Sequence, residues 1–222
     1  SEVGYFNLAQ KITSPFFMII GFALAALFPN LSILWSQDQI KFKIKIVNGI
    51  KYFMILLAFL SFFFTLFASE LITLTFTNKY INAVKVSQTQ IWFVLLLGMN
   101  SFIGTIWGSC NKEKLLIKTT IVNAVIATPV LLFGSHYGAL GLSFGYVLSF
   151  SVFEIYLWII FVKSLGLPAH FGLKYWILIV LLFLTSYYVL ASMCFVIKII
   201  ILISILVLGV CFYKKLFSNV KI

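Results

Sequence analysis

Long apolar stretches recur along the whole chain, each close to the roughly 20 residues that a helix needs to cross a hydrocarbon core of about 30 Å. Only 9% of the residues are charged, whereas 63% are hydrophobic. A soluble domain carries roughly 25% charged residues, so a water-soluble globule of this composition would have too little polar surface to cover itself. We therefore expect the chain to be an integral membrane protein.

The apolar stretches predict seven membrane-spanning helices in an all-α, polytopic bundle. The last two are separated only by Ala-Ser-Met-Cys, but one helix of their combined length would be too long for a single crossing. The loops are short, so we interpret residues 1–222 as a single transmembrane domain. The predicted spans are Pro15–Trp35, Tyr52–Phe76, Ile91–Cys110, Leu115–Phe133, Ala139–Val162, Tyr175–Leu190 and Phe195–Tyr213.

The longest connection runs from Ser36 to Lys51 and alternates lysine with Ile, Phe and Val. Such alternation is also compatible with a strand. We favour an amphipathic element that lies on the cytoplasmic headgroups, because basic and apolar side chains can then reach water and lipid together.

The basic residues are all lysine, and the net charge is +11. In a soluble protein this charge would suggest a nucleic-acid partner, but here the lysines sort by side. With the C-terminus in the cytoplasm, twelve lie inside and four outside, as the positive-inside rule requires. We therefore expect anionic membrane lipids, and no nucleic acid, as partners. The inner set is Lys41, Lys43, Lys45, Lys51, Lys112, Lys114, Lys118, Lys163, Lys174, Lys214, Lys215 and Lys221; the outer set is Lys11, Lys79, Lys85 and Lys198.

The chain begins with Ser1 and shows neither an initiator methionine nor the features of a signal peptide. We interpret it as the C-terminal part of a longer protein whose N-terminal half is missing. A processed, complete chain is the alternative.

Residues typical of catalysis and metal binding are scarce. Cys110, Cys194 and Cys211 have no metal-ligand spacing, and His136 and His170 lie alone in predicted loops. Walker A and HExxH motifs are absent from the sequence. We predict no catalytic residue, metal or cofactor, and a protein that moves a substrate without reacting with it.

Small residues and one proline mark helix contacts and a helix break. Gly104-x-x-x-Gly108 and Gly141-x-x-x-Gly145 are typical of surfaces where helices pack closely in lipid. Pro29 removes a hydrogen bond to the carbonyl one turn earlier, so a kink or unwound turn is expected there. Such breaks often lie beside a transport pathway, but a proline at an ordinary helix end fits equally well.

Glu154 is the most informative polar residue, because it lies within the fifth apolar stretch. Ionisable side chains in a membrane seldom face lipid. At 100° per residue, Ser143, Ser151, Glu154 and Trp158 fall along one stripe, opposite Gly145. This stripe is expected to face the bundle interior or an aqueous cavity. Glu154 is then either a site that couples transport to a proton or cation, or a structural carboxyl held neutral.

Three further polar residues are candidates for contact with a substrate or a coupling ion. Asn100 shares a face with Gly104, and Asn123 lies in the fourth span; both also fit hydrogen bonding between helices. Lys11 stands at the outer entry of the first span, where it can attract an anionic substrate or extend to the headgroups.

Five short motifs, in order, resemble those of one transporter family. They are Val3–Lys11 (VGxYxxAxK, with Phe6 in place of Tyr), Phe28–Ser32 (PxxS), Phe76–Ala83 (FGxxYxxA, with Thr77 in place of Gly), Asn111–Lys114 (GxxK, with Asn111 in place of Gly) and Tyr137–Gly141 (YGxxG). The family is the O-antigen/polysaccharide flippases of the multidrug/oligosaccharidyl-lipid/polysaccharide exporter superfamily, and the resemblance spans roughly residues 3–165.

This resemblance implies a complete protein of two helical bundles around a central cavity, with this chain as the second bundle and the terminal helices. It implies flipping of undecaprenyl-pyrophosphate-linked oligosaccharide across the bacterial inner membrane by alternating access. A polysaccharide polymerase and a chain-length regulator are the implied partners.

Two other functions remain open at this stage. One is an integral membrane polysaccharide polymerase or glycosyltransferase, although the loops are short and the chain lacks arginine. The other is a cation-coupled drug exporter of the same superfamily.

Overall fold

The computed structural model describes residues 2–76, 80–167 and 173–190, and its elements there are helices without any strand. The all-α bundle is thus confirmed for this part of the chain. The helices are α1 (Glu2–Gln37), α2 (Gln39–Phe76), α3 (Ala83–Ser109), α4 (Glu113–Ser135), α5 (Gly138–Leu165) and α6 (Leu173–Leu184), which continues into the π-helix η2 (Thr185–Leu190).

Five of these helices, α1 to α5, are long and apolar enough to cross a membrane. They contain most of the first five predicted spans and are longer than predicted. With 36 and 38 residues, α1 and α2 exceed the roughly 20 that a crossing needs, so their ends extend toward the headgroups. The predicted sixth span corresponds to α6 and η2, whereas Phe195–Tyr213 lies outside the described residues. A total of seven spans therefore stays a prediction.

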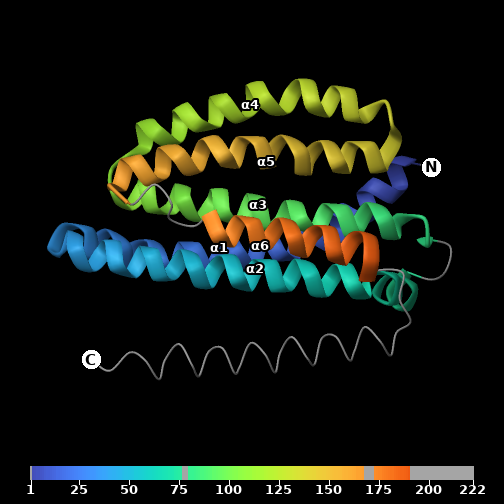
Figure 1. Cartoon of the computed structure of the whole chain (residues 1–222), viewed down its shortest axis with the longest axis horizontal. Coiled ribbons are helices and arrows are strands. Elements are labelled where there is room, and N and C mark those ends of the chain that lie inside the picture. The colour runs from blue at the N-terminus through green and yellow to red at the C-terminus, as the bar shows by residue number, and fades with distance from the viewer. Residues whose placement is uncertain (1, 77–79, 168–172, 191–222) are drawn as a thin grey trace.

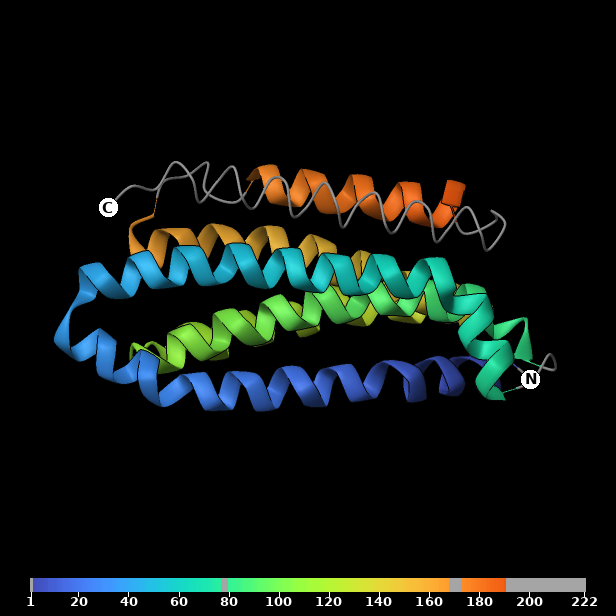
Figure 2. The ribbon, with the colours of Figure 1, turned by 90° about the horizontal axis from the view of Figure 1, so that it is seen from below.

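Helix α3 lies at the centre of the bundle. It packs against α1, α2 and α5, and α4 packs mainly against α5. Figure 1 shows α4 and α5 along one edge and α2 along the other, with α3 and α6 between them. In Figure 2, α1 and α6 lie on opposite sides of α2 and α3. The central position of α3 explains why its face toward the neighbours is almost fully buried.

The N-termini of α1, α3 and α5 meet at one end of the bundle. The Glu2 carboxylate accepts a hydrogen bond from the Ala139 N–H at 2.8 Å, and the Asn82 amide donates to the Tyr5 hydroxyl at 3.4 Å. Lys11 and Lys85 lie toward this end. The opposite end, where these helices finish, gathers Lys41, Lys43, Lys45, Lys51, Lys112, Lys114, Lys118 and Lys163. Among these ten lysines the predicted sorting is thus a property of the fold, while Lys79, Lys198, Lys214, Lys215 and Lys221 lie outside the described residues. The identity of the cytoplasmic side stays a prediction.

The structure corrects the prediction for residues 36–51. Instead of a separate surface element, this segment forms the end of α1 and the first turns of α2, which continues to Phe76. Phe42, Ile46 and Ile50, each four residues apart, are at most 2% exposed and belong to the core. Their spacing places them on one helical face, so burial of this face extends the helix into the lysine-rich segment.

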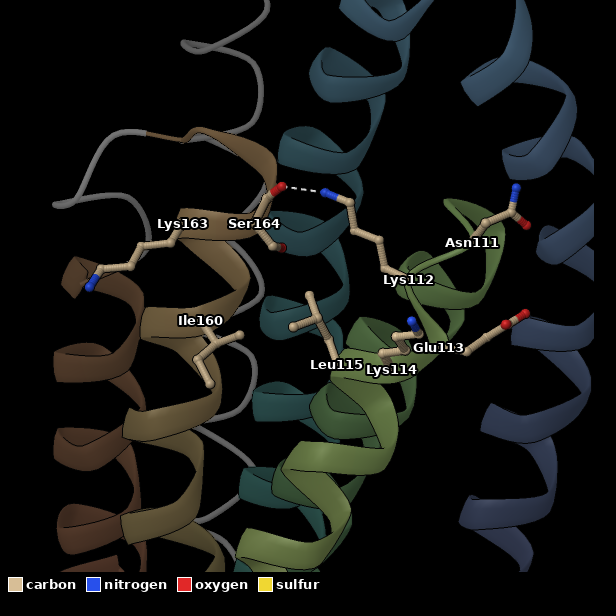
Figure 3. A pocket seen from close by; sticks show the side chains of 8 residues that line it. All are labelled: Asn111, Lys112, Glu113, Lys114, Leu115, Ile160, Lys163 and Ser164. Carbon is tan, nitrogen blue, oxygen red and sulfur yellow. Dashed lines mark hydrogen bonds between the residues drawn. The ribbon is translucent and has the colours of Figure 1, made fainter.

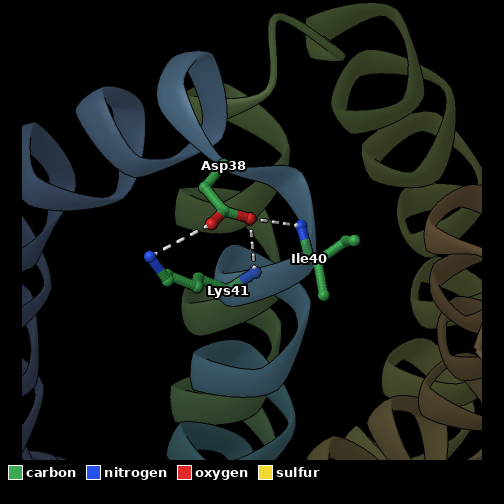
Figure 4. A network of polar contacts seen from close by, with 3 residues as sticks. All are labelled: Asp38, Ile40 and Lys41. Atoms are coloured by element: carbon green, nitrogen blue, oxygen red, sulfur yellow. Dashed lines mark hydrogen bonds and ion pairs between the residues drawn. The ribbon is translucent and has the colours of Figure 1, made fainter.

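Asp38 marks the boundary between α1 and α2. Its carboxylate accepts hydrogen bonds from the N–H groups of Ile40 and Lys41, at 3.0 and 2.9 Å, and its other oxygen lies 3.4 Å from the Lys41 ammonium (Figure 4). These are the contacts of an N-cap, which satisfies donors left free at the start of a helix. Hydrogen bonding from the Lys41 N–H lowers the pKa of Asp38.

Both glycine motifs lie in helix contacts, as predicted. In α5, a Cβ at Gly141 would lie 2.6 Å from the Gly134 carbonyl oxygen of α4, and one at Gly145 would lie 3.3 Å from the Val130 carbonyl. In α3, Gly104 approaches Leu116 of α4 and Gly108 approaches Phe28 of α1. Helices α4 and α5 therefore touch backbone to backbone near their glycine-bearing ends.

The expected unwinding at Pro29 is not seen, because α1 remains helical from Glu2 to Gln37. One hydroxyl near the proline also bonds within the helix, since Ser32 donates to the Phe28 carbonyl at 3.1 Å. Pro29 is exposed. A role for this residue beside a pathway stays a prediction.

Candidate functional site

Helix α5 places Glu154 in the interior of the bundle, on the side that the sequence predicts. The side chain is 2% exposed, and neither carboxyl oxygen has a hydrogen-bond partner within the described part of the chain. One turn further on, Trp158 packs edge-to-face against Trp176 of α6 at 5.9 Å. Helix α6, which packs mainly against α2, thus also contacts α5 one turn from the buried carboxyl.

Aromatic contacts fix the register of the parallel helices α3 and α5. Phe93 meets Phe150 with ring centroids 4.8 Å apart, and Trp107 meets Phe161 at 6.4 Å. The Trp107 indole N–H also donates to the Ser164 hydroxyl at 2.9 Å. These pairs show which face of each helix points toward the other.

Asn100 and Glu154 lie near the same level of this register. Counted seven residues back from the Trp107–Phe161 pair, the residue of α5 level with Asn100 is Glu154. Counted seven residues forward from the Phe93–Phe150 pair, it is Leu157. Asn100 and Glu154 therefore lie within about one turn of each other in depth, and no hydrogen bond joins them.

The other predicted site residues have no hydrogen bond to Glu154 in the described contacts. Ser151, one turn before Glu154 on α5, is half-buried, and its hydroxyl donates to the Val147 carbonyl at 2.6 Å. Asn123 lies on α4, where its side-chain oxygen is buried without a partner among the described residues. Lys11 is exposed on α1, near the end that carries few lysines. Of the predicted set, Ser151 and Glu154 share one turn of α5, and Asn100 lies on the neighbouring helix α3.

Sequence reasoning missed a buried polar run at the start of α3, Ser87–Gln90. The predicted span begins only at Ile91, but these four residues before it are at most 6% exposed. The Gln88 amide donates to the Thr65 carbonyl of α2 at 2.9 Å. Within the described ranges the Ser87 hydroxyl and the Gln90 side-chain oxygen have no partner. The available signal was Val84, which lies seven residues before Ile91 and so on nearly the same side of a helix that begins earlier.

A hydrogen-bonded network joins α2 and α3 beside this run. The Trp92 indole N–H donates to the Thr65 hydroxyl at 2.9 Å, and that hydroxyl donates to the Ser61 carbonyl at 2.7 Å. The Ser61 hydroxyl in turn donates to the Ile91 carbonyl at 3.2 Å. Such pairing is what polar groups require in a bundle surrounded by hydrocarbon, so this network holds the two helices in register.

One strip of α3 is left partly uncovered by the helices around it. Ser101 is exposed and Thr105 is half-buried, and Gly104 and Gly108, which approach Leu116 of α4 and Phe28 of α1, lie beside them on the helix. The Ser101 hydroxyl donates to the Leu97 carbonyl at 2.8 Å, and the Thr105 hydroxyl donates to the Ser101 carbonyl at 2.9 Å. The strip therefore offers small side chains and little bulk on this side of α3.

The described residues contain no group of three or more His, Cys, Asp or Glu side chains that could hold a metal ion. Comparisons with known protein families, with curated proteins and with solved structures find no match to this chain.

Proposed function

We propose that this chain forms half of a membrane exporter that flips undecaprenyl-pyrophosphate-linked oligosaccharide across the bacterial inner membrane by alternating access. The main support is Glu154, a carboxyl that is buried in a bundle of membrane-crossing length and has no hydrogen-bond partner in the part of the chain that the structure describes.

A lone buried carboxylate is very unfavourable in an apolar interior, because ionisation there requires a paired charge or hydrogen bonds. A carboxyl kept only for packing would be expected to have such partners. Glu154 lacks them within the described residues. We infer that it takes up a proton or small cation in one state of the exporter and releases it in another.

Asn100 is suited to assist this exchange, because its amide can donate to an ionised carboxylate and accept from a protonated one. Its depth in the α3–α5 interface lies within about one turn of that of Glu154. In the proposed cycle, a small shift between α3 and α5 brings the amide to the carboxyl. The partly uncovered strip of α3 with Ser101 and Thr105 is the proposed border of the substrate pathway.

The proposed substrate rests on the five motifs described above. One departure from the motifs, Asn111 in place of glycine, keeps the backbone conformation that a glycine would allow. Asn111 adopts a left-handed conformation, with φ of 56°. Glycine is the usual residue in this conformation and asparagine the next best tolerated. Asn111 can therefore replace the family's glycine in this turn, which supports the likeness.

Deletion of the full-length gene tests the proposal. We expect undecaprenyl-linked repeat units to accumulate on the cytoplasmic face of the membrane, with loss of surface glycan. A surface glycan of single, unpolymerised repeats would contradict flipping and indicate a polymerase. Normal glycan with increased sensitivity to drugs would indicate a drug exporter.

A further inference from the structure

An open hollow of about 720 Å³ lies at the lysine-rich end of the bundle. Its walls come from the turn between α3 and α4, the first turn of α4 and the last turns of α5 (Figure 3). The lysines that line it are Lys112, Lys114 and Lys163, and the apolar lining residues are Leu115 and Ile160.

The positions of the glycines explain why the helices separate here. The single glycine of α4, Gly134, lies at the far end of that helix, and the glycines of α5 lie in its first eight residues, up to Gly145. The helices touch through these glycines. At the lysine-rich end, larger side chains such as Leu115 and Ile160 hold the backbones apart. A hollow at this end therefore follows from the distribution of small residues.

The charges at the hollow favour an anion. Lys112 already has partners within the protein. Its ammonium donates to the Ser164 carbonyl and lies 5.8 Å from the centre of the Trp35 ring. Lys114 and Lys163 are exposed, and Lys163 points away from Lys112 in Figure 3. Their long, flexible side chains can turn toward a ligand at the mouth. Glu113 opposes them with one negative charge, so the lining keeps a positive balance.

The floor of the hollow is apolar. Leu115 and Ile160, which line it, are both half-buried. A ligand with a charged head and a long apolar tail can therefore satisfy the lysines and cover the floor together.

We propose that this hollow binds one anionic phospholipid of the surrounding leaflet, with its phosphate near Lys114 and Lys163 and an acyl chain over Leu115 and Ile160. Basic pockets between helices at the headgroup level are suited to such lipids. A free phosphate would leave the apolar floor uncovered. This inference does not depend on the proposed flipping activity.

The test uses the complete protein in detergent, with phosphatidylglycerol as the anionic probe, phosphatidylcholine as the zwitterionic control, and native mass spectrometry to measure bound lipid. We expect phosphatidylglycerol to be retained over phosphatidylcholine. The double variant Lys114→Gln/Lys163→Gln should weaken retention about 25-fold, roughly fivefold per lysine. The matched control, Lys11→Gln/Lys85→Gln at the opposite end, should not change it.

A second variant tests the contribution of the apolar floor to lipid binding separately from that of the lysines. Ile160→Trp should fill the hollow and reduce retention of phosphatidylglycerol while all lysines remain. Equal retention by both lysine double variants would overturn the proposal. Stabilisation by inorganic phosphate as strong as that by phosphatidylglycerol would also overturn it. So would displacement of phosphatidylglycerol by undecaprenyl diphosphate at equal concentration, because the hollow would then belong to the exported lipid.

Discussion

The Glu2 carboxylate accepts a hydrogen bond from the Ala139 N–H at 2.8 Å and so connects the start of α1 to the start of α5, 137 positions away. A carboxylate at this place satisfies a free donor and is favoured by the positive end of the helix dipole. The contact requires Gly138, whose φ is 73° and where a Cβ would lie 2.7 Å from the Glu2 oxygen.

Gly138→Ala should therefore destabilise the bundle. A left-handed conformation costs a side-chain-bearing residue about 1–2 kcal/mol, and the added methyl group displaces the Glu2 carboxylate. We expect the thermal midpoint to fall by roughly 2–8 °C, since 1 kcal/mol shifts a chain of this size by about 2–4 °C. Gly21→Ala is the control, because no atom lies within 4 Å of its Cβ position and alanine favours a helix. Equal midpoints for both variants would contradict this role of Gly138.

Asn111 and Gly166 end α3 and α5 in the same way, with φ of 56° and 65°. In each turn the next residue donates back into the helix, Lys112 to the Trp107 carbonyl and Leu167 to the Val162 carbonyl. This pattern is typical of a Schellman C-cap, which favours glycine. Asn111→Gly should therefore maintain or raise the thermal midpoint, and Asn111→Val should lower it. A midpoint for the valine variant at or above that of the native protein would argue against the left-handed turn.

The burial and the close contacts of side chains were predictable where the sequence pattern that indicates them lies within one helix. The burial of Glu154 follows from its place on a stripe of α5, and the close contacts of Gly141 and Gly145 follow from their spacing. The burial of Ser87–Gln90 was not predictable from local hydropathy, because polar residues lower it. Their environment comes from α2, where Thr65 pairs with Gln88, 23 positions away. The register between α3 and α5 likewise depends on contacts that no local pattern encodes.

The pair of Thr65 and Trp92 offers a test of the α2–α3 network. Both residues are buried, and Thr65→Val would leave the indole N–H without its acceptor. Interhelical hydrogen bonds in membrane proteins contribute about 0.6 kcal/mol on average. We expect a double-mutant cycle of Thr65→Val and Trp92→Phe, measured by unfolding in detergent, to show a coupling of that order. Strictly additive effects would mean that the bond does not stabilise the bundle.

The capping contacts of Asp38 predict that the local stability of the first turn of α2 depends on pH. Hydrogen bonding from the Lys41 N–H lowers the pKa of this carboxyl below its ordinary 3.8. Its stabilising effect is therefore complete above that value and is lost as the pH falls through the lowered pKa. Amide exchange at Ile40 and Lys41 should accelerate in this acidic range. Asp38→Asn keeps a capping oxygen without a titrating group, so the ratio of exchange rates in native and variant protein should isolate the effect. A ratio that is constant with pH would contradict it.

Glu154→Gln tests the proposed coupling site, because glutamine keeps the size of the side chain but cannot exchange a proton. Removing a carboxyl that has no hydrogen-bond partner in the described ranges should leave the stability unchanged or raise it. Export should nevertheless fall, as measured by surface glycan in cells that carry the full-length variant at normal protein levels. Ser151→Ala is the matched control from the same helix, since the Ser151 hydroxyl bonds only within α5 in the described contacts.

The combination of the two measurements decides the role of Glu154. A structural carboxyl would lose stability on replacement, whereas a coupling carboxyl would lose export while the bundle remains equally stable or becomes more so. Asn100→Leu should reproduce the loss of export if the amide assists the exchange, because Asn100 lies within about one turn of the depth of Glu154 in the α3–α5 interface. Unchanged surface glycan in the Glu154→Gln variant, at normal protein levels, would assign Glu154 to packing and remove the main support for coupling at this site.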